Sequence, residues 1–242
     1  MPEPRPARNP AALLLIGATF AYIGLVLLLP LGALAARTLA HGPAAIVRAL
    51  LEPDALSGLF FTVAITAGTL LVNGVAGVAG AIVLVRHRFP GRRVLDLLVD
   101  LPLAVSPVMI GLAFLLVFGR DGWLEPLLRP AGIRVAFAIP GVFLVTLFVT
   151  LPYTVREIAY VLEELGTTEE EVAATLGATP WQTFRRVTLP NIRHGLQLGL
   201  TLTGARALGE FGAALVIGGA ISGRTATATT YIYAAMEERN EA

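Results

Sequence analysis

The sequence contains no cysteine and no lysine, although it is 242 residues long. Without cysteine, the chain has no disulfide, no thiolate nucleophile and no cysteine-based metal site. Without lysine it has no phosphate-binding P-loop, because the lysine of that motif reaches the phosphates of the bound nucleotide. We therefore predict that the chain is not itself an ATPase, and that a separate subunit hydrolyses ATP if ATP drives its activity.

Charged residues are scarce as well. Only 14% of the residues are charged, the formal net charge is +1, and hydrophobic residues make up 55% of the chain. This composition and a mean hydropathy of +0.74 are typical of an all-α, polytopic membrane protein, and they do not indicate nucleic-acid binding. The three histidines, His41, His87 and His194, lie far apart in the sequence, each near a predicted membrane boundary. We therefore expect no metal site and no cofactor.

Five long apolar runs predict a single transmembrane domain, residues 11–242, after a short cytoplasmic tail, residues 1–10. The predicted spans are about 11–36, 56–85, 94–118, 135–155 and 195–221. The first run also has features of a signal peptide, because Ala33-Leu34-Ala35 is similar to a cleavage site. Since this run is longer than the apolar part of a usual signal peptide and more spans follow, we favour an uncleaved first span. The second span contains four glycines that predict close helix packing, Gly68, Gly74, Gly77 and Gly80.

The turn RHRFPGRR, residues 86–93, sets the predicted orientation of these spans. It contains four arginines and no acidic residue, which places it in the cytoplasm. Alternation along the chain then places the N-terminal tail and the long loop 156–194 on the same side. The last stretch, residues 231–242, is too short and too charged to span a membrane, so five spans leave the C-terminus outside.

The long loop contains an organised polar stretch, TEEEVAATLGATPWQTFRRVTLPNIR, residues 168–193. Its turn and cap residues predict two short helices. Thr168 and Glu171 are spaced as a capping box for the first helix, and Gly177 suits the left-handed residue that ends it. Thr179-Pro180-Trp181-Gln182 has the pattern that starts the second helix, and Leu189-Pro190 is predicted to end the unit.

An apolar side is predicted for the same stretch. It consists of residues at helical spacing, Val172, Leu176, Trp181, Phe184 and Val187. A cytoplasmic loop with two capped helices and an apolar side is typical of a segment that docks into a groove of a partner protein. The alternative is an amphipathic loop that lies on the lipid surface.

Residues 168–193 resemble the EAA loop of ABC-importer permeases, whose pattern is Glu-Ala-Ala, a glycine four residues after the second alanine, and later Ile-x-Leu-Pro. Val172 replaces the first alanine and Val187 the isoleucine. The resemblance implies that the loop docks into a cleft of the ATPase subunit and passes its motion to the membrane helices. The coupling residues it implies are Glu171, Ala173, Gly177, Val187, Leu189 and Pro190.

Ionisable groups inside predicted spans are costly, so they are candidates for the translocation pathway. Arg206 and Glu210 lie four residues apart in the fifth span and are spaced to pair on one helix face. They are either a structural pair or residues that line the pathway near its gate. An anion pathway gains from an arginine and is hindered by an unpaired carboxylate, which makes pairing the consistent arrangement.

The third span holds a second set of pathway candidates, Asp100, Ser106 and Pro107. Pro102 and Pro107 interrupt the backbone hydrogen bonds, and freed N–H groups together with the Ser106 hydroxyl are suited to an oxyanion. A simple proline kink is the alternative. Near the start of the same span, Asp96 is expected to pair with Arg92 and Arg93.

Four stretches resemble the sulfate/thiosulfate permeases of the CysW type: DLPLAVSPVMIGLAFLLVFG (100–119), PGVFLVTLFVTLPYTVRE (140–157), LGATPWQTFRRVTLPNIR (176–193) and ARALGEFGAALVIGGAISGRT (205–225). The resemblance implies a type I helical core in the bacterial plasma (inner) membrane. It also implies a heterodimer with a second permease chain, two copies of an ATPase and an extracytoplasmic binding protein that delivers the oxyanion. Such permeases normally have a sixth span at this point, which we do not identify in the sequence; either the sequence is truncated or the protein ends here.

Two other functions stay open. ARALGEFGA, residues 205–213, is shared with molybdate and tungstate permeases, so a permease for one of these oxyanions, as a homodimer, is one alternative. A stand-alone secondary transporter, in which Asp100 or Glu210 carries protons, is the alternative from another class. It predicts uptake driven by a proton gradient without any ATPase.

Overall fold

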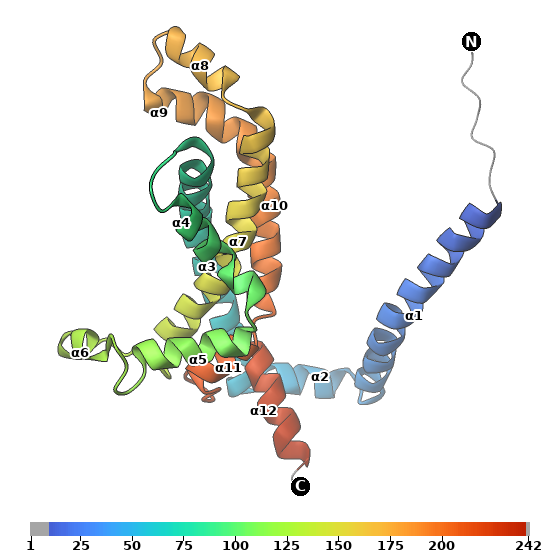
Figure 1. The fold of residues 1–242 in the computed structure, drawn as a ribbon. Helices are drawn as coiled ribbons and strands as arrows, with labels where there is room; N and C mark the ends of the chain where they lie inside the picture. Colours follow the sequence, from blue (N-terminus) through green and yellow to red (C-terminus); the bar gives the residue numbers. More distant parts are fainter. Residues whose placement is uncertain (1–9, 241–242) are drawn as a thin grey trace. The chain divides into compact units, whose positions relative to one another are not determined.

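The structure, a computed structural model, describes residues 10–240 (Figure 1). The expected cytoplasmic tail, residues 1–10, lies outside the described residues except for Pro10, which begins a helix. Every regular element in residues 10–240 is helical, which confirms the all-α prediction. Whereas we expected one domain over residues 11–242, the chain divides into two compact units, residues 1–52 and 53–242, and each is described by itself.

The first unit consists of two helices, α1 (Pro10–Ala40) and α2 (Pro43–Leu50). α1 includes the whole of the predicted first span, 11–36, and is long and apolar enough to cross a membrane. Its apolar side chains are exposed all along the helix; Leu14, Leu28 and Leu34 are examples. A helix that is hydrophobic on every side is typical of a membrane span.

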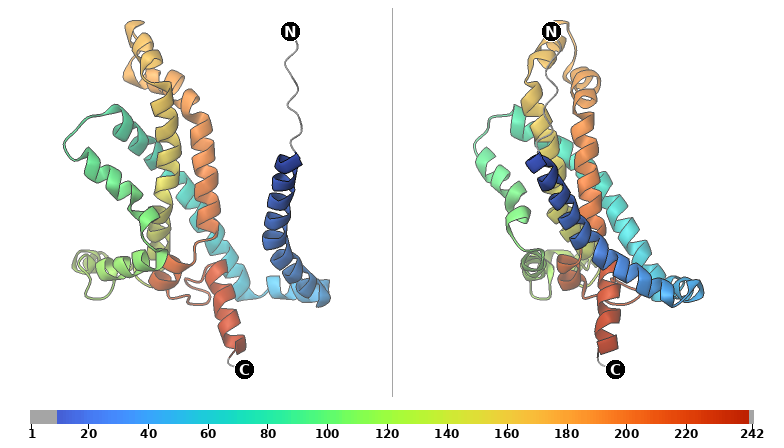
Figure 2. Two further views of the ribbon diagram at one scale, coloured as in Figure 1. Left: turned by 45° about the vertical axis from the view of Figure 1, so that its right-hand side comes forward. Right: turned by 90° about the vertical axis from the view of Figure 1, so that its right-hand side faces the viewer.

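Three long helices form the centre of the second unit: α3 (Pro53–Arg86), α7 (Ile139–Leu165) and α10 (Leu189–Leu208). Each packs against the other two, as two further views show (Figure 2). Two apolar clusters fill the space between them and their neighbours. One surrounds Val145 and Ile217, and the other surrounds Ile158 and Ile192.

Small residues let the three long helices approach one another closely. A Cβ atom on Gly77 of α3 would lie 2.9 Å from Cβ of Thr154, and one on Gly199 of α10 would lie 2.9 Å from Cα of the same threonine. A Cβ on Gly68 would likewise lie 2.9 Å from the ring of Phe143. The predicted close packing is confirmed at Gly68 and Gly77.

Polar side chains join the same helices where they are buried. Asn73 of α3 donates hydrogen bonds to the carbonyl oxygen of Leu147 (3.2 Å) and to Oγ1 of Thr150 (2.9 Å). The hydroxyls of Thr154 and Thr203 lie 2.8 Å apart and link α7 to α10. In an apolar surrounding, such bonds stabilise helix association because no water competes for the donors and acceptors.

The predicted third span, 94–118, is not one helix. It consists of α4 (Arg92–Ala104) and α5 (Pro107–Phe118), which are bent by 120° relative to each other. Pro107 supplies the physical reason: it has no N–H, and it forces the preceding residue out of the helical conformation. Ser106 is accordingly extended, with ψ 136°. The expectation that a proline interrupts this span is confirmed at Pro107, but not at Pro102, which lies inside α4.

The predicted fifth span, 195–221, also differs from the structure. A helical segment starts at Pro180 and runs to Leu208, and α11 (Gly212–Gly218) follows after a bend of 55°. α12 (Ala228–Asn240) covers the end of the expected polar turn and the stretch that follows it. Ala228 at its start donates its N–H to Oγ1 of Thr62, 2.8 Å away on α3.

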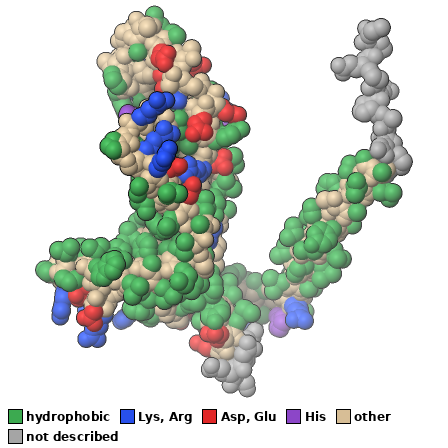
Figure 3. Space-filling view, viewed as in Figure 1, with side chains coloured by type: hydrophobic (Ala, Val, Ile, Leu, Met, Phe, Trp, Pro, Cys, Tyr) green, Lys and Arg blue, Asp and Glu red, His purple; other side chains and the backbone are tan. Residues whose placement is uncertain are grey.

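Three helices among the described residues are long and apolar enough to cross a membrane, α1, α3 and α7, and the two bent pairs raise the number to five. The connection after α5 holds the short helix α6 (Glu125–Leu128) and the 3-10 turn η1 (Arg129–Ala131). On the face drawn in Figure 3, charged side chains of the second unit gather toward α8 and α9 and again below α5 and α6, with a mostly uncharged band between. This pattern is typical of a protein that crosses a bilayer.

Candidate functional site: the segment from residue 168 to 193 and the broken helices

Residues 168–193 form two short helices before the chain enters α10. They are α8 (Thr168–Thr175) and α9 (Pro180–Thr183), and Gly177 between them has a φ of +84°. Gln182 donates its N–H to the Thr179 hydroxyl, and the Gln182 side chain accepts the N–H of Thr179. The predictions of a left-handed glycine and of a capping box at the second helix are confirmed.

The predicted capping box at the first helix is wrong. Thr167, and not Thr168, is the N-cap residue of α8, and its side chain caps no backbone N–H. The Thr167 hydroxyl instead donates to Oε1 of Glu171, 2.6 Å away. α7 ends at Leu165 and Gly166 turns the chain with a φ of +62°, so the helical conformation already begins at Thr168. A residue inside the helix is no longer placed to cap it.

Three apolar residues of the two short helices are exposed. Val172 is 53% exposed, Leu176 83% and Trp181 67%. The Trp181 ring stacks on Phe184 with centroids 5.4 Å apart, which holds the indole in place. Exposed apolar side chains in such number on a short polar segment indicate a contact surface for another molecule.

The predicted apolar side is divided by the structure. Phe184 lines an apolar groove of about 720 Å³ together with Trp181, Leu189 and residues of α3 and α10. Val187 points instead toward a small cavity on another side, beside Arg86. The five residues therefore do not form one continuous face.

Leu189-Pro190 does not end the helical unit, contrary to the prediction. Residues Phe184–Thr188 form a π-helical turn, η2, that runs directly into α10. The N–H of Leu189 bonds to the carbonyl oxygen of Phe184, five residues earlier. A π turn widens the backbone by one residue, so the proline ring and its missing N–H are accommodated without breaking the helix.

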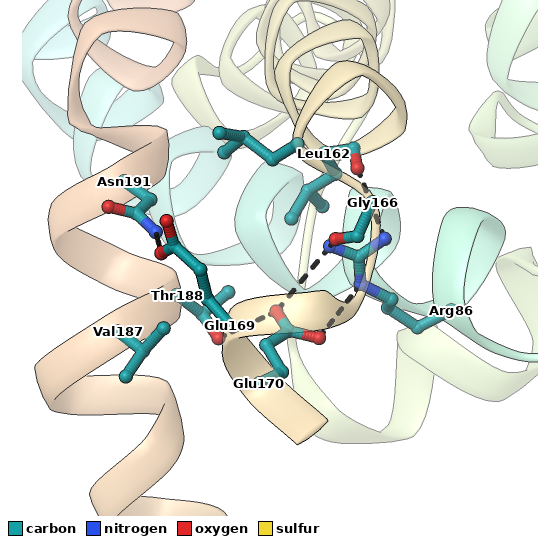
Figure 4. Close-up of a pocket in the computed structure, with 9 residues that line it drawn as sticks. Arg86, Leu162, Gly166, Glu169, Glu170, Val187, Thr188 and Asn191 are labelled. Carbon is teal, nitrogen blue, oxygen red and sulfur yellow. Dashed lines mark hydrogen bonds and ion pairs between the residues drawn. The ribbon is translucent and has the colours of Figure 1, made fainter. Parts of the chain in front are cut away.

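A cluster of polar contacts holds α8 against the rest of the second unit (Figure 4). Arg86, the last residue of α3, lies with Nε 3.0 Å from Oε2 of Glu170. Its two terminal nitrogens donate to the carbonyl oxygens of Leu162 (3.1 Å) and Gly166 (2.6 Å). Thr188 of η2 donates to Oε1 of Glu170 at 2.9 Å. We call this cluster, Arg86, Glu170, Thr188 and the carbonyls of Leu162 and Gly166, the α8 clamp.

Sequence reasoning missed the α8 clamp. In the sequence, Arg86 stands out only as one of four arginines in a predicted cytoplasmic turn, and nothing distinguishes Glu170 from the neighbouring Glu171. The two residues are 84 positions apart, and no local pattern connects them. Beside the clamp, Asn191 of α10 donates to the carboxylate of Glu169, which is a second link from α8 to α10.

Asp96 and Asp100 share one partner. Arg156 of α7 places Nη2 2.7 Å from Oδ1 of Asp96 and 2.7 Å from Oδ2 of Asp100. Its Nε donates to Oδ1 of Asp100 at 2.7 Å. The expected pairing of Asp96 with the arginines at 92 and 93 is wrong, because α4 packs on α7 and brings both aspartates to a side chain 56 or more residues away.

Arg206 and Glu210 form the predicted ion pair. Nη1 of Arg206 lies 2.8 Å from Oε2 of Glu210, whose side chain is only 3% exposed. Glu210 does not lie in mid-helix, however: α10 ends at Leu208, and the carboxylate accepts the N–H of Ala213 in α11 at 3.1 Å. The pair therefore holds the bend between α10 and α11.

The two helix breaks lie next to each other. A Cβ atom on Gly212, at the start of α11, would lie 3.6 Å from Cβ of Pro107 and 3.0 Å from Val108. The exposed Ser106 precedes this contact and makes no side-chain cap. Ser106, Pro107 and the Arg206–Glu210 pair thus belong to one region, whereas Asp100 is bound by Arg156.

The described residues contain no group of three or more metal-ligating side chains.

The chain is similar to a known protein family and to individual members of it. The family described as "Binding-protein-dependent transport system inner membrane component" matches residues 73–237. The chain is 46% identical to "Sulfate permease 2, chloroplastic" of Chlamydomonas reinhardtii, over 97% of this chain and 64% of that protein. It is 40% identical to "Sulfate transport system permease protein CysW" of Synechococcus elongatus, over 93% of this chain and 79% of that protein.

The fold has a counterpart among solved structures. It is similar to a chain in the crystal structure of a bacterial ABC transporter involved in the import of the acidic polysaccharide alginate, with a TM-score of 0.73 over 94% of this chain and 85% of that chain. The sequence identity is 17%, so this likeness concerns the fold alone. The resemblance that the sequence indicated is confirmed by these matches. The chain belongs to the family of inner membrane components of binding-protein-dependent transport systems, the permeases of ABC importers.

Proposed function

We propose that the chain carries sulfate or thiosulfate through the membrane as a permease subunit of an ATP-driven importer, and that residues 168–193 couple it to the ATPase. The observation that carries the coupling proposal is the exposed apolar surface of Val172, Leu176 and Trp181 on two short helices that are tied to the transmembrane helices. The names of the two similar sulfate permeases support the substrate.

The proposed coupling residues act in different ways. Glu171 and Ala173 lie on α8. Gly177, with its positive φ, turns the chain between α8 and α9. Val187, Leu189 and Pro190 belong to η2 and the start of α10. They therefore lie in the connection through which a movement of the docked helices enters the membrane.

The pathway is proposed to run past the neighbouring helix breaks. An anion needs donors that hold it weakly, so that it can be released on the other side. Ser106 and Pro107 stand at the start of α5, where free backbone N–H groups are suited to an oxyanion. The carboxylate of Glu210 is neutralised by Arg206, which removes the charge that would repel an anion. Asp100, bound by Arg156, ties α4 to α7 beside this region.

The proposed assembly contains two copies of an ATPase, a second permease chain and an extracytoplasmic binding protein. The binding protein delivers the oxyanion, and closure of the ATPase dimer moves α8 and α9 together with the helices attached to them. The membrane helices then expose the pathway to one side after the other.

Uptake of radiolabelled sulfate tests the proposal. The chain is expressed, together with the ATPase, second permease and binding protein of a sulfate importer, in cells that lack their own sulfate permease. We expect uptake of sulfate that requires the ATPase. Thiosulfate should compete with this uptake, and molybdate should not. Competition by molybdate at equal concentration would favour a molybdate or tungstate permease, and uptake driven by a proton gradient without the ATPase would favour a secondary transporter.

A further inference from the structure

The α8 clamp joins four parts of the second unit through three side chains, those of Arg86, Glu170 and Thr188. Arg86 belongs to α3, the carbonyls of Leu162 and Gly166 belong to the end of α7 and the turn after it, and Glu170 belongs to α8. Thr188 adds η2, the turn that leads into α10. As Figure 4 shows, the guanidinium lies between the end of α7 and the carboxylate of Glu170.

Arg86 donates four hydrogen bonds within the clamp. The arginine fork donates to both oxygens of Glu170 and to two backbone carbonyls, which are among the free acceptors that a helix end leaves. The side chains of Arg86 and Glu170 are only 14% and 23% exposed, so water replaces these bonds poorly. A guanidinium that binds a carboxylate and two carbonyls in this manner is geometrically specific, because its donors are fixed in one plane.

The position of Glu170 distinguishes the clamp from an ordinary helix cap. Glu170 lies on α8, between the helix surface that carries Val172 and Leu176 and the ends of α3 and α7. A force applied to the exposed surface of α8 therefore reaches α3 through Arg86 and α10 through Thr188. Without the clamp, α8 would keep its link to α10 through Glu169 and Asn191 but would lose its side-chain link to α3 and to the end of α7.

We propose that Arg86 and Glu170 are positioning residues for coupling: they make α8 move as one body with α3, α7 and α10, so that each ATPase cycle moves the transmembrane helices. This inference rests on the proposed import function. It gives a role in coupling to two residues that do not belong to the exposed apolar surface of α8 and α9. Binding of the ATPase and transmission of its movement to the membrane helices then depend on different residues.

The test measures the number of sulfate ions imported per ATP hydrolysed by the complete complex in proteoliposomes. Glu170→Gln keeps the size and the acceptor oxygen of the side chain but removes its charge. Arg86→Gln removes the fork, and Arg86→Lys keeps the charge with fewer donors. The matched control is Glu163→Gln, the same chemical change on an exposed residue near the end of α7.

We expect both glutamine variants to copurify with the ATPase in normal amount and to hydrolyse ATP, while the import ratio falls about tenfold, as the loss of a charge-assisted hydrogen bond implies. Arg86→Lys is expected to lie between Arg86→Gln and the unchanged protein, and Glu163→Gln to keep the normal ratio. A normal ratio in Glu170→Gln would overturn the proposal. Loss of the ATPase from either glutamine variant would also overturn it, because the clamp would then serve docking alone.

If Glu170→Gln does not accumulate in the membrane, Thr188→Val decides in its place. It removes one hydrogen bond to Glu170 and leaves both charges. We expect a lower ratio with normal ATPase content, and an unchanged ratio would refute the clamp. Failure of the unchanged complex to import sulfate would contradict the proposed function, whereas import by the unchanged complex with a normal ratio in Thr188→Val contradicts only the clamp.

Discussion

Replacement of Gly177 tests the geometry of residues 168–193, the proposed coupling segment, directly. The residue has a φ of +84°, and a Cβ atom built on it has no neighbour within 4 Å. Alanine therefore meets no steric clash, and its cost is the left-handed conformation alone, about 1–2 kcal/mol. Such a cost lowers the population of the correctly folded segment by roughly 5- to 30-fold relative to misfolded alternatives.

Proline at the same position has a far larger effect. Its ring fixes φ near −65°, so the left-handed conformation is inaccessible. It also removes the N–H that bonds to the carbonyl oxygen of Ala174 at 3.0 Å. We expect Gly177→Pro to remove the turn between α8 and α9 completely, while Gly177→Asn, which tolerates positive φ, stays close to the unchanged protein.

The assay is the affinity of the detergent-purified permease complex for its ATPase, with the amount of permease in the membrane measured alongside. The expected order of affinity is glycine, asparagine, alanine, proline. The matched control is Gly132→Ala, since Gly132 also has a positive φ (+67°) and open space around a Cβ, but lies in the connection after α6. Normal ATPase binding by Gly177→Pro would refute the reasoning, and so would an equal loss of binding in Gly132→Ala.

Two further predictions concern the helical core. Gly77→Val is expected to destabilise the protein by about 1–3 kcal/mol, because the new side chain overlaps Thr154. The control is Gly74→Val, whose Cβ meets only an ordinary contact at 3.6 Å. Thermal unfolding of both variants checks this prediction, and equal melting temperatures would contradict it. Arg206→Met leaves the buried Glu210 carboxylate without its partner and is expected to cost about 3–5 kcal/mol. The double change with Glu210→Gln should recover most of the loss in the same measurement, and a stable single variant would show that the pair does not hold the bend.

Local rules predicted the structure of residues 168–193 in good part. Gly177 and the box at Thr179 and Gln182 are decided by a few neighbouring residues, and a positive φ or a capped N-terminus needs no information from elsewhere in the chain. The same holds for the break before Pro107, where the proline itself excludes the helix. The local rule failed at Pro190, where the π turn Phe184–Thr188 precedes the proline and the helix continues through it.

Contacts between distant residues were beyond sequence reasoning. The partners of Asp96 and Glu170 are decided by how α4, α7 and α3 are rotated about their axes, and several arginines offer the same charge to each carboxylate. The ion pair of Arg206 and Glu210 was predictable because its partners are only four residues apart. Apolar runs located the spans, but they contain no signal for the angle at which α10 continues into α11.

The helical segment from Pro180 to Leu208 is continuous, so a tilt at one end moves the other end. At a rise of about 1.5 Å per residue it is roughly 43 Å long, so a tilt of about 10° swings one end by roughly 7 Å relative to the other. Arg206 lies near the end of this segment, whereas Glu210 lies in the bend beyond it. Nη1 of Arg206 is only 2.8 Å from Oε2 of Glu210. A small tilt of this segment at the α9 end therefore becomes a displacement of several ångström at the bend, where α11 either follows the end of α10 or separates from it.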